Sequence, residues 1–358
     1  QDLGCQEVIC NRLSSLGFTI RRINIQDTSN IWATYGNCGK TINFLGHTDV
    51  VPVGELKDWR FHPFQPTIHE GVLFGRGAAD MKGAIAAMII AIERFVLCYP
   101  DHVYRLTLIL TSDEESKAIN GTVKVVDYLL SKKETIDYCI VGEPTSIQQI
   151  GDTIKNGRRG SLTANIIIYG VQGHIAYPEL ANNPIHTVLP FLSALISKEW
   201  SKKDSFFSKT SVQLSQIRSD LQCSNMIPGS VFIQFNFRYG MNITAELIKL
   251  EVNKLLNFYK LKYSIEWNFS GHPFLNKKSK LVSIVKDVIY FVNNVNSNLS
   301  TDGGTSDGRF LAKMSAQIVE LGLINKNIHK VNECIKVSDL QLLSQMYFEI
   351  IRRLVLFS

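Results

Sequence analysis

The first 150 residues alternate short apolar runs with helical patterns, and this alternation limits the possible folds more than any other feature. Strands are predicted at residues 41–45, 104–110 and 138–141, and helices at 81–97 and 122–131. The first of these helices is rich in Ala and Ile and ends shortly before Pro100. Alternation of this kind is typical of a mostly parallel sheet with helices on both faces. We therefore expect an α/β domain.

The pattern changes near residue 160 and returns near residue 273. Two long β-rich stretches, SLTANIIIYG and GSVFIQFNFRYG, flank an apolar helix predicted at 184–200. A second helix (246–259) and a strand (262–269) follow, which together favour a small α+β unit with an open antiparallel sheet. After it, a helix (279–292), a strand (317–321) and a closing helix restore the α/β pattern. We expect one α/β domain formed by 1–159 and 273–358, interrupted by an α+β domain at 160–272.

Composition excludes several classes of partner. Of 358 residues, 45% are hydrophobic and 20% charged, which is ordinary for a globular protein. The net charge of +6 comes from scattered basic residues, so nucleic acid is not a favoured partner, whereas a small anionic substrate fits. The chain contains no apolar run of membrane-spanning length, so no membrane partner is expected. Seven cysteines without a CxxC motif indicate reduced thiols and a cytoplasmic location.

Polar residues follow the predicted strands at the points where those strands end. In open α/β sheets, ligands bind outside the carboxyl ends of the strands. Taken singly, each residue has a plain structural explanation, such as a helix N-cap for Asp80 or a hydrogen-bonded pair for His47 and Asp49. Taken together, they are expected to share one edge of the sheet. The residues are His47, Asp49, Asp80, Glu114, Glu115, Glu143 and His329.

These side chains form a nitrogen and oxygen ligand set, which suits Zn²⁺, with Co²⁺ as a substitute. Their number exceeds what a single catalytic zinc requires, so two ions that share a bridging carboxylate are indicated. Glu114 and Glu115 are adjacent and usually project in different directions, so one can bind metal while the other acts as a general base.

Competing catalytic motifs are missing from the sequence. The glycine-rich GRGAADMKG lacks the third glycine of a dinucleotide-binding turn, and no Walker A pattern occurs. Neither a GxSxG elbow nor an HExxH motif is present. A nucleotide-binding α/β protein is therefore not indicated.

The chain resembles the M20 metallopeptidase and deacylase family over nearly its whole length. The resemblance rests on GHTDVVPVG, GRGAADMKG, TSDEE, GEPTS, NGRRGS, GHIAYP, NPIH, STDGGTSDGRF and IHKVNE. It implies a catalytic domain with two zinc ions, for which cobalt can substitute. It also implies that the inserted domain serves dimerisation as a lid, so that the protein forms a homodimer.

The resemblance further implies a role for each candidate ligand. His47 and Glu143 would bind one zinc ion, and Glu115 and His329 the other. Asp80 would bridge the two ions.

Three further residues would take part in the reaction. Asp49 would orient the first metal-binding histidine, and Glu114 would be the general base. His174, in the inserted domain, would reach across the dimer and stabilise the oxyanion. Without the resemblance, His174 would be interpreted as a surface histidine.

Substrate contacts are implied by the same motifs. Arginine binds carboxylates in a bidentate manner, and backbone N–H groups next to glycines can approach an anion. The candidates are Arg158, Asn225, Arg238, Gly304, Thr305 and Ser306.

The implied activity is hydrolysis of an N-succinyl amide of a diamino acid. A related deacylase acting on acetylornithine is the alternative, and a non-catalytic binding protein is a second one. The second alternative would be expected to lack Glu114 or a ligand, and none is missing. The chain departs from the family in residues 218–224, which contain no glycine, and at Leu323, where a proline is usual.

Overall fold

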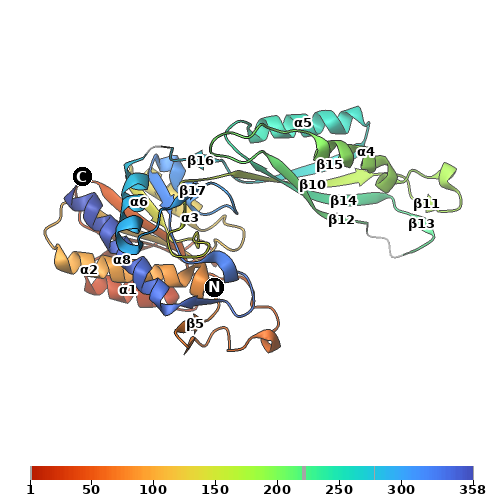
Figure 1. Ribbon diagram of the computed structural model, residues 1–358. Coiled ribbons are helices and arrows are strands. Elements are labelled where there is room, and N and C mark those ends of the chain that lie inside the picture. Colours follow the sequence, from red (N-terminus) through yellow and green to blue (C-terminus); the bar gives the residue numbers. More distant parts are fainter. Residues whose placement is uncertain (1, 220–222, 278, 358) are drawn as a thin grey trace. The chain divides into compact units, whose positions relative to one another are not determined.

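The computed structural model describes residues 2–219, 223–277 and 279–357 (Figure 1). Packing divides the chain into two compact units. Unit 1 contains Gln1–Gly157, Leu275–Ser300 and Ser306–Ser358, and unit 2 contains Arg158–Phe274 and Thr301–Thr305. The return of residues 301–305 to unit 2 has no counterpart in the sequence-based prediction.

Unit 1 is built on a mixed sheet whose central strands are parallel. In spatial order the strands are β1 (Thr19–Arg22), β2 (Asn30–Tyr35), β6 (Arg105–Thr111), β3 (Thr41–His47), β7 (Tyr138–Val141), β18 (Gln317–Glu320), β8 (Thr153–Lys155) and β17 (Asn298–Ser300). The neighbours β6–β3, β3–β7 and β7–β18 are parallel, whereas β1 and β2 add an antiparallel edge. The predicted α/β fold class is confirmed, and the carboxyl ends of β3, β6 and β7 lie at one edge.

Helices cover both faces of this sheet. The helices α1 (Cys5–Ser15), α2 (Gly83–Cys98), α6 (Lys280–Asn293) and α8 (Val337–Leu356) share one core with alternate residues of the strands, such as Phe44. The next residue along, Leu45, is fully buried outside that core, which places it on the opposite face. There α3 (Thr122–Ser131) and the short α7 (Gly308–Leu311) pack against the strands.

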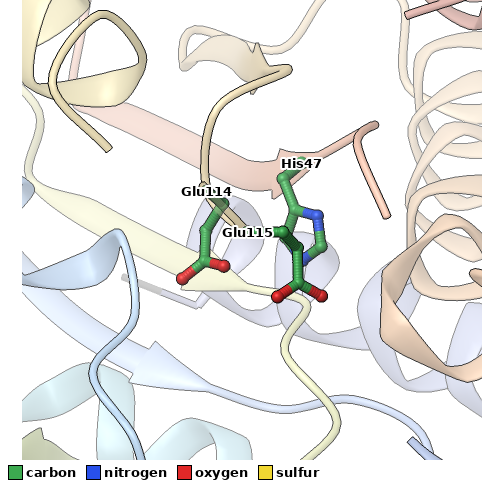
Figure 2. A group of neighbouring side chains, drawn as sticks. All are labelled: His47, Glu114 and Glu115. Carbon is green, nitrogen blue, oxygen red and sulfur yellow. The ribbon is translucent and has the colours of Figure 1, made fainter. Parts of the chain in front are cut away.

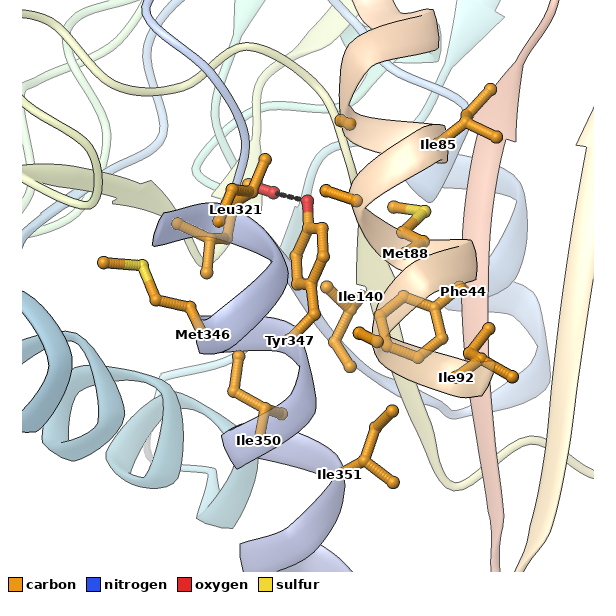
Figure 3. Close-up of a cluster of buried hydrophobic side chains, with 14 of the residues drawn as sticks. Phe44, Ile85, Met88, Ile92, Ile140, Leu321, Met346, Tyr347, Ile350 and Ile351 are labelled. Atoms are coloured by element: carbon orange, nitrogen blue, oxygen red, sulfur yellow. Dashed lines mark hydrogen bonds between the residues drawn. The ribbon is translucent and has the colours of Figure 1, made fainter. Parts of the chain in front are cut away.

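Part of the core of unit 1 lies between α2 and α8 (Figure 3). Tyr347 of α8 is fully buried there, and its ring meets Phe44 of β3 edge to face at a centroid distance of 5.5 Å. Its hydroxyl donates a hydrogen bond of 2.5 Å to the carbonyl of Leu321, so the polar end of this side chain is satisfied. α2 packs closely against α8, whereas its Ile90 and Leu97 side chains are exposed.

Unit 2 is a two-layer α+β structure. Its antiparallel sheet has the order β12 (Ser211–Arg218), β14 (Ser230–Tyr239), β10 (Gly160–Tyr169) and β15 (Lys262–Gly271). The helices α4 (Pro184–Ser197) and α5 (Ala245–Phe258) pack on one face over inward residues such as Phe235 and Phe237. On the other face, polar side chains pair across strands, as in the 2.9 Å hydrogen bond that Gln234 donates to Asn165.

Short elements complete the two units. In unit 1, β4 (Thr67–His69), β5 (Val72–Phe74) and β19 (Cys334–Lys336) form a small antiparallel sheet. In unit 2, β11 (Gly173–His174) pairs with β13 (Met226–Ile227). The remaining pieces are β9 (Gly157–Arg158), β16 (Phe274–Leu275), η1 (Leu56–Asp58), η2 (Ala78–Lys82), η3 (Pro178–Leu180), η4 (Ala312–Met314) and η5 (Asn325–Asn327). Within the part of the chain that the structure describes, no helix is long and apolar enough to cross a membrane.

The predicted helix at 81–97 begins two residues later than expected. Asp80 and Met81 have non-helical backbone angles inside η2, and regular helix begins at Gly83. Asp80 is therefore not the N-cap of α2, and its side chain is available for another role.

Candidate metal centre

Two strands end close to η2 because each has a glycine immediately before a candidate ligand. A Cβ atom at Gly46 would lie 2.8 Å from the methyl carbon of Met81, and one at Gly142 would lie 2.6 Å from the same methyl carbon. Cβ contacts under 3.0 Å are essentially never found, so a larger residue at either position would force the Met81 side chain to move. The close approach brings His47, the last residue of β3, and Glu143, just beyond β7, next to the turn that carries Asp80.

Asp80 lies between two histidines that come from distant parts of the chain. Its Oδ1 atom is 3.2 Å from Nε2 of His47, and its Oδ2 atom is 3.1 Å from Nε2 of His329. The two oxygens of one carboxylate therefore face two different imidazoles, which is the arrangement of a bridging ligand.

Each histidine also faces a second carboxylate. Oε1 of Glu143 is 3.7 Å from Nε2 of His47, and Oε1 of Glu115 is 3.0 Å from Nε2 of His329. The sets His47–Asp80–Glu143 and Asp80–Glu115–His329 each offer ligand atoms that lie within 4.8 Å of one another. All five metal ligands predicted from the sequence thus come together.

Glu114 joins a third set, with His47 and Glu115, whose atoms also lie within 4.8 Å of one another. Figure 2 shows both glutamate carboxyl groups and the imidazole directed to the same region, with the Glu114 carboxyl the more distant from the ring in this view. Glu114 belongs to neither set that contains Asp80.

Asp49 connects the segment that carries His47 to the segment that carries Glu114 and Glu115. Its carboxylate accepts hydrogen bonds from the backbone N–H groups of Glu114 (3.3 Å) and Glu115 (2.9 Å). Nδ1 of His47 lies 3.0 Å from the backbone carbonyl of Asp49 and 3.6 Å from its carboxylate, so the carbonyl is the nearer partner. Asp49 therefore positions the imidazole chiefly through its backbone and the two glutamates through its side chain.

Proton affinities at the centre are strongly perturbed. Burial disfavours a charged His47, but the hydrogen bonds to Asp49 and Asp80 outweigh it and raise the pKa of His47 well above its usual value. The hydrogen bond to Asp80 is the main cause that raises the pKa of His329 to about 9. The same two histidines outweigh the burial of Asp80 and lower the pKa of its carboxyl group.

The pKa values of the three glutamates are raised, unlike that of Asp80. Burial raises the pKa of Glu114 to about 8, and it also raises the pKa of Glu115 and of Glu143, with neighbouring carboxylates adding to the effect. Ionisation of these three carboxyl groups is thus disfavoured, because each would place a negative charge near other carboxylates in a poorly hydrated region. Cations placed among these oxygens would relieve the repulsion.

The donor set and its spacing fit two divalent cations. Tetrahedral zinc at ~2.0–2.2 Å from its ligands keeps those ligands roughly 3.3–3.6 Å apart. The nitrogen–oxygen distances of 3.0–3.7 Å around His47 and His329 fall close to this range. Imidazole nitrogens and carboxylate oxygens are ligands that zinc accepts.

Two of the other predicted site residues lie together in unit 2. His174 and Asn225 are both exposed, and the backbone N–H of Ile175 donates a 3.0 Å hydrogen bond to the carbonyl of Asn225. Nδ1 of His174 accepts from the backbone N–H of Ala176, which leaves Nε2 as the nitrogen free of that bond.

Arg158 is more buried than a surface clamp would be, at 7% exposed. Its Nη1 atom donates to the backbone carbonyls of Asp302 (3.3 Å) and Gly304 (3.0 Å). Arg158 therefore holds the segment that carries Gly304 and Thr305, and Thr301 and Asp302 of the same segment bond to Phe206 and Ser208 of unit 2.

The last two predicted substrate contacts differ in exposure. Arg238 is half-buried on the face of β14 that turns away from α4 and α5, opposite Ser161. Ser306 is fully buried and its hydroxyl hydrogen-bonds to Glu320, so within unit 1 it has a structural partner.

Of the two sequence departures, the one at Leu323 lies wholly within the described residues. Leu323 is fully buried in the core of unit 1, and its carbonyl accepts a 3.1 Å hydrogen bond from the backbone N–H of Ser146. In the glycine-free segment 218–224, residues 220–222 lie outside the described residues.

Arg76 and Glu333 have no predicted role, although they lie in the motifs GRGAADMKG and IHKVNE. They form a buried ion pair of 2.9 Å beside the metal centre. The available signal was an acidic residue four positions after His329, which is too common a pattern to indicate a function.

A family model, peptidase family M20/M25/M40, matches residues 44–353. The chain belongs to this family. Members of family M20 are metallohydrolases, which agrees with the ligand sets above.

Relatives of the chain within the M20 family include succinyl-diaminopimelate desuccinylases. The protein of this name from Buchnera aphidicola subsp. Acyrthosiphon pisum (strain APS) is 54% identical over 99% of this chain and 94% of its own length. A second desuccinylase, from strain Tuc7 of the same organism, is also 54% identical over 99% of this chain and 94% of its own length.

Solved structures share the M20 fold at low identity. A metallo-carboxypeptidase of family M20 from Sulfolobus solfataricus has a TM-score of 0.81 and 18% identity, over 97% of this chain and 92% of that one. A dinuclear metal binding peptidase of the family from Bacillus subtilis has a TM-score of 0.73 and 13% identity, over 99% and 93%.

Metal binding is expected to release protons from this centre. With a pKa of about 9, His329 carries a proton near neutral pH, and Glu114, with a pKa of about 8, largely does so too. A metal ligand must be deprotonated, so metal affinity should rise as the pH rises through the pKa of His329 at about 9. Calorimetric titration with Zn²⁺ in buffers of different ionisation enthalpy measures the protons released.

The matched variant for this measurement is His329→Ala, which should release about one proton fewer per chain. Metal affinity that stays constant over this pH range, with no proton release, would contradict the expected protonation of the centre.

Proposed function

We propose that this protein is a two-metal amide hydrolase that removes succinate from N-succinyl-LL-2,6-diaminopimelate. The observation that carries the proposal is Asp80, whose two carboxylate oxygens face His47 and His329 at 3.2 and 3.1 Å. The name of the relatives at 54% identity supports the substrate. The products would be succinate and LL-2,6-diaminopimelate, and the step belongs to diaminopimelate and lysine biosynthesis in the cytoplasm.

Two Zn²⁺ ions, or Co²⁺ in their place, would occupy the two ligand sets that share Asp80. His47 and Glu143 would hold one ion, and Glu115 and His329 the other. When bound, the ions would supply Lewis acidity for the amide carbonyl and lower the pKa of the nucleophilic water.

Glu114 would act as the general base. It is partly buried beside the ligands, yet it belongs to neither set that shares Asp80, so its carboxylate remains available for a proton. Its pKa of about 8 reflects burial without cations, and nearby positive charge would lower it toward the pH at which the enzyme works. After accepting a proton from water, the Glu114 carboxyl would deliver it to the leaving amine. Asp49 would hold this glutamate in place through the backbone.

Substrate carboxylates would be recognised mainly from unit 2. Arg238 would provide a guanidinium fork, and Asn225 a side-chain amide. Arg158, which holds the 302–304 segment, would contribute a second guanidinium group. Gly304 and Thr305 would offer donors on that segment, and Ser306 would fix its end through Glu320.

The inserted domain at 160–272 would serve as the dimerisation domain and lid, and the protein would work as a homodimer. His174 would then complete the partner's site and stabilise the oxyanion. The side chain of His174 is exposed, and its Nδ1 atom takes the hydrogen bond from Ala176, so Nε2 is the nitrogen that could contact a group beyond its own unit.

A substrate comparison tests the reaction. With Zn²⁺ or Co²⁺ present, kcat/KM for N-succinyl-LL-2,6-diaminopimelate should exceed that for N-acetylornithine by a factor of ~10³ or more, because sites that bond a polar group reject analogues without it by about 10⁴–10⁵. A preference for N-acetylornithine would assign the protein to the other deacylase, and no hydrolysis with metal bound would favour a binding protein.

Replacement of the base should separate catalysis from metal binding. Glu114→Gln removes the proton acceptor but no member of the Asp80 sets, so it should retain both metals while kcat falls by ~10²–10⁴-fold. His47→Ala is the comparison variant and should lose metal as well as rate. Metal content and single-turnover rates measure the two effects, and near-normal turnover by Glu114→Gln would reject its role.

Complementation between inactive variants tests His174. Purified His174→Ala and Glu114→Gln should each be nearly inactive. After subunit exchange, about half of the dimers are mixed and each has one intact site, so activity should return to about one quarter of the wild-type value. Proven exchange without any recovery would show that His174 does not act across the dimer.

A further inference from the structure

A buried arginine–glutamate pair lies beside the metal centre without contributing a ligand. The side chains of Arg76 and Glu333 are only 2% and 1% exposed, and Nη1 of the arginine is 2.9 Å from Oε2 of the glutamate. A buried ion pair is weak support for a fold by itself, because desolvation of the two charges offsets their attraction. The other contacts of the two side chains explain their presence better.

Glu333 binds the backbone of the turn that carries Asp80. Its Oε1 atom accepts hydrogen bonds from the backbone N–H groups of Ala79 (2.8 Å) and Asp80 (3.0 Å). Its Oε2 atom accepts another from the backbone N–H of Gly77 (3.0 Å). One carboxylate therefore fixes three backbone positions of this turn, including that of the bridging aspartate itself.

Arg76 connects the same turn to two other ligand-bearing segments. Its Nη1 atom donates to the backbone carbonyl of Lys330 (3.0 Å), the residue after His329. Its Nη2 atom donates to the carbonyl of Pro52 (3.1 Å), in the loop that follows His47 and Asp49. The guanidinium group thus joins three segments that are far apart in the sequence.

The pairing of β5 with β19 brings Arg76 and Glu333 next to each other. β5 ends at Phe74 and β19 begins at Cys334, and these two residues are register partners. The backbone N–H of Gly75 then donates a 3.0 Å hydrogen bond to the carbonyl of Glu333. The pair therefore sits where the chain enters the Asp80 turn on one strand and leaves the His329 segment on the other.

We propose that Glu333 and Arg76 are positioning residues that hold Asp80 and His329 at the separation at which both bind the same metal ion. The proposal rests on the proposed function, because it takes these two residues to be metal ligands. The ion held by Asp80, Glu115 and His329 depends most on this pair, since both segments that supply it are tied to the pair. The ion held by His47 and Glu143 depends on it only through Asp80 and the Pro52 contact.

The decisive variant is Glu333→Gln, which keeps the shape of the side chain. Its amide nitrogen cannot accept hydrogen bonds, so at least one N–H group of the turn loses its partner, and Arg76 loses its counter-charge. Replacement of groups that orient metal ligands typically lowers metal affinity 10–100-fold. We expect a loss of this size for one of the two ions and a smaller loss for the other.

The measurement is titration of the purified, metal-free protein with Co²⁺, followed by visible absorption and by metal content after dialysis. Wild-type protein should hold about two ions per chain and Glu333→Gln about one under the same conditions. Activity of the variant should recover at high Co²⁺ concentration, because Glu333 takes no chemical part in the reaction. If Glu333 had a purely structural role, Glu333→Gln would lower thermal stability but would not change the affinity for one ion more than for the other.

Asp137→Asn is the matched control. The carboxylate of Asp137 accepts a 2.8 Å hydrogen bond from the backbone N–H of Thr41, at the end of β3 opposite His47. This variant changes the same kind of bond in the same unit and should titrate with Co²⁺ like the wild-type protein.

The outcomes separate this proposal from the proposed function. Wild-type protein that binds no metal would overturn both. If wild-type protein binds two ions and is active, and folded Glu333→Gln gives the same Co²⁺ titration as wild type, only the positioning role is overturned. If circular dichroism shows that Glu333→Gln is unfolded, Arg76→Lys carries the test, because it keeps the charge but cannot reach Lys330, Pro52 and Glu333 together. Unchanged affinity for both ions in that variant would likewise overturn the role.

Discussion

The repulsion among buried carboxylates around Asp80 is the constraint on which the rest of this structure depends. Burial and neighbouring charge raise the pKa of Glu114, Glu115 and Glu143, so the unliganded chain must hold together groups that would separate in water. The surrounding protein opposes this separation with hydrogen bonds to the backbone. Asp49 fixes the two adjacent glutamates, and its counterpart Glu333 fixes the Asp80 turn.

Much of the fold could be predicted from sequence because its signals are local. The helix at Thr122–Ser131 and the strand at Tyr138–Val141 have the predicted bounds, since apolar periodicity changes sharply at their ends. The start of α2 could not be predicted in the same way, because the apolar pattern continues through Met81 while the backbone does not. The return of residues 301–305 to unit 2 is accompanied by hydrogen bonds from Arg158 to backbone carbonyls, which leave no sequence pattern.

The candidate site shows the same division. His47, Asp80, Glu115, Glu143 and His329 were predicted because side chains that bind metal must be of particular types at the ends of particular strands. Glu333 was overlooked because it acts on backbone N–H groups, which every residue except proline possesses. Asp49 was assigned to His47, and the structure adds that its carboxylate serves the two glutamates more directly. Contacts with backbone can be recognised only once the turns themselves are placed.

The glycines at the ends of β3 and β7 have a consequence for how this centre tolerates change. Gly46 and Gly142 leave room for the methyl group of Met81, and that group sets how near the two strand ends come to the turn. A single added methyl at either position would meet this methyl group, so the buried Met81 side chain would have to shift beside the turn that carries Asp80. The packing around the centre therefore depends on two residues that have no side-chain functional group at all.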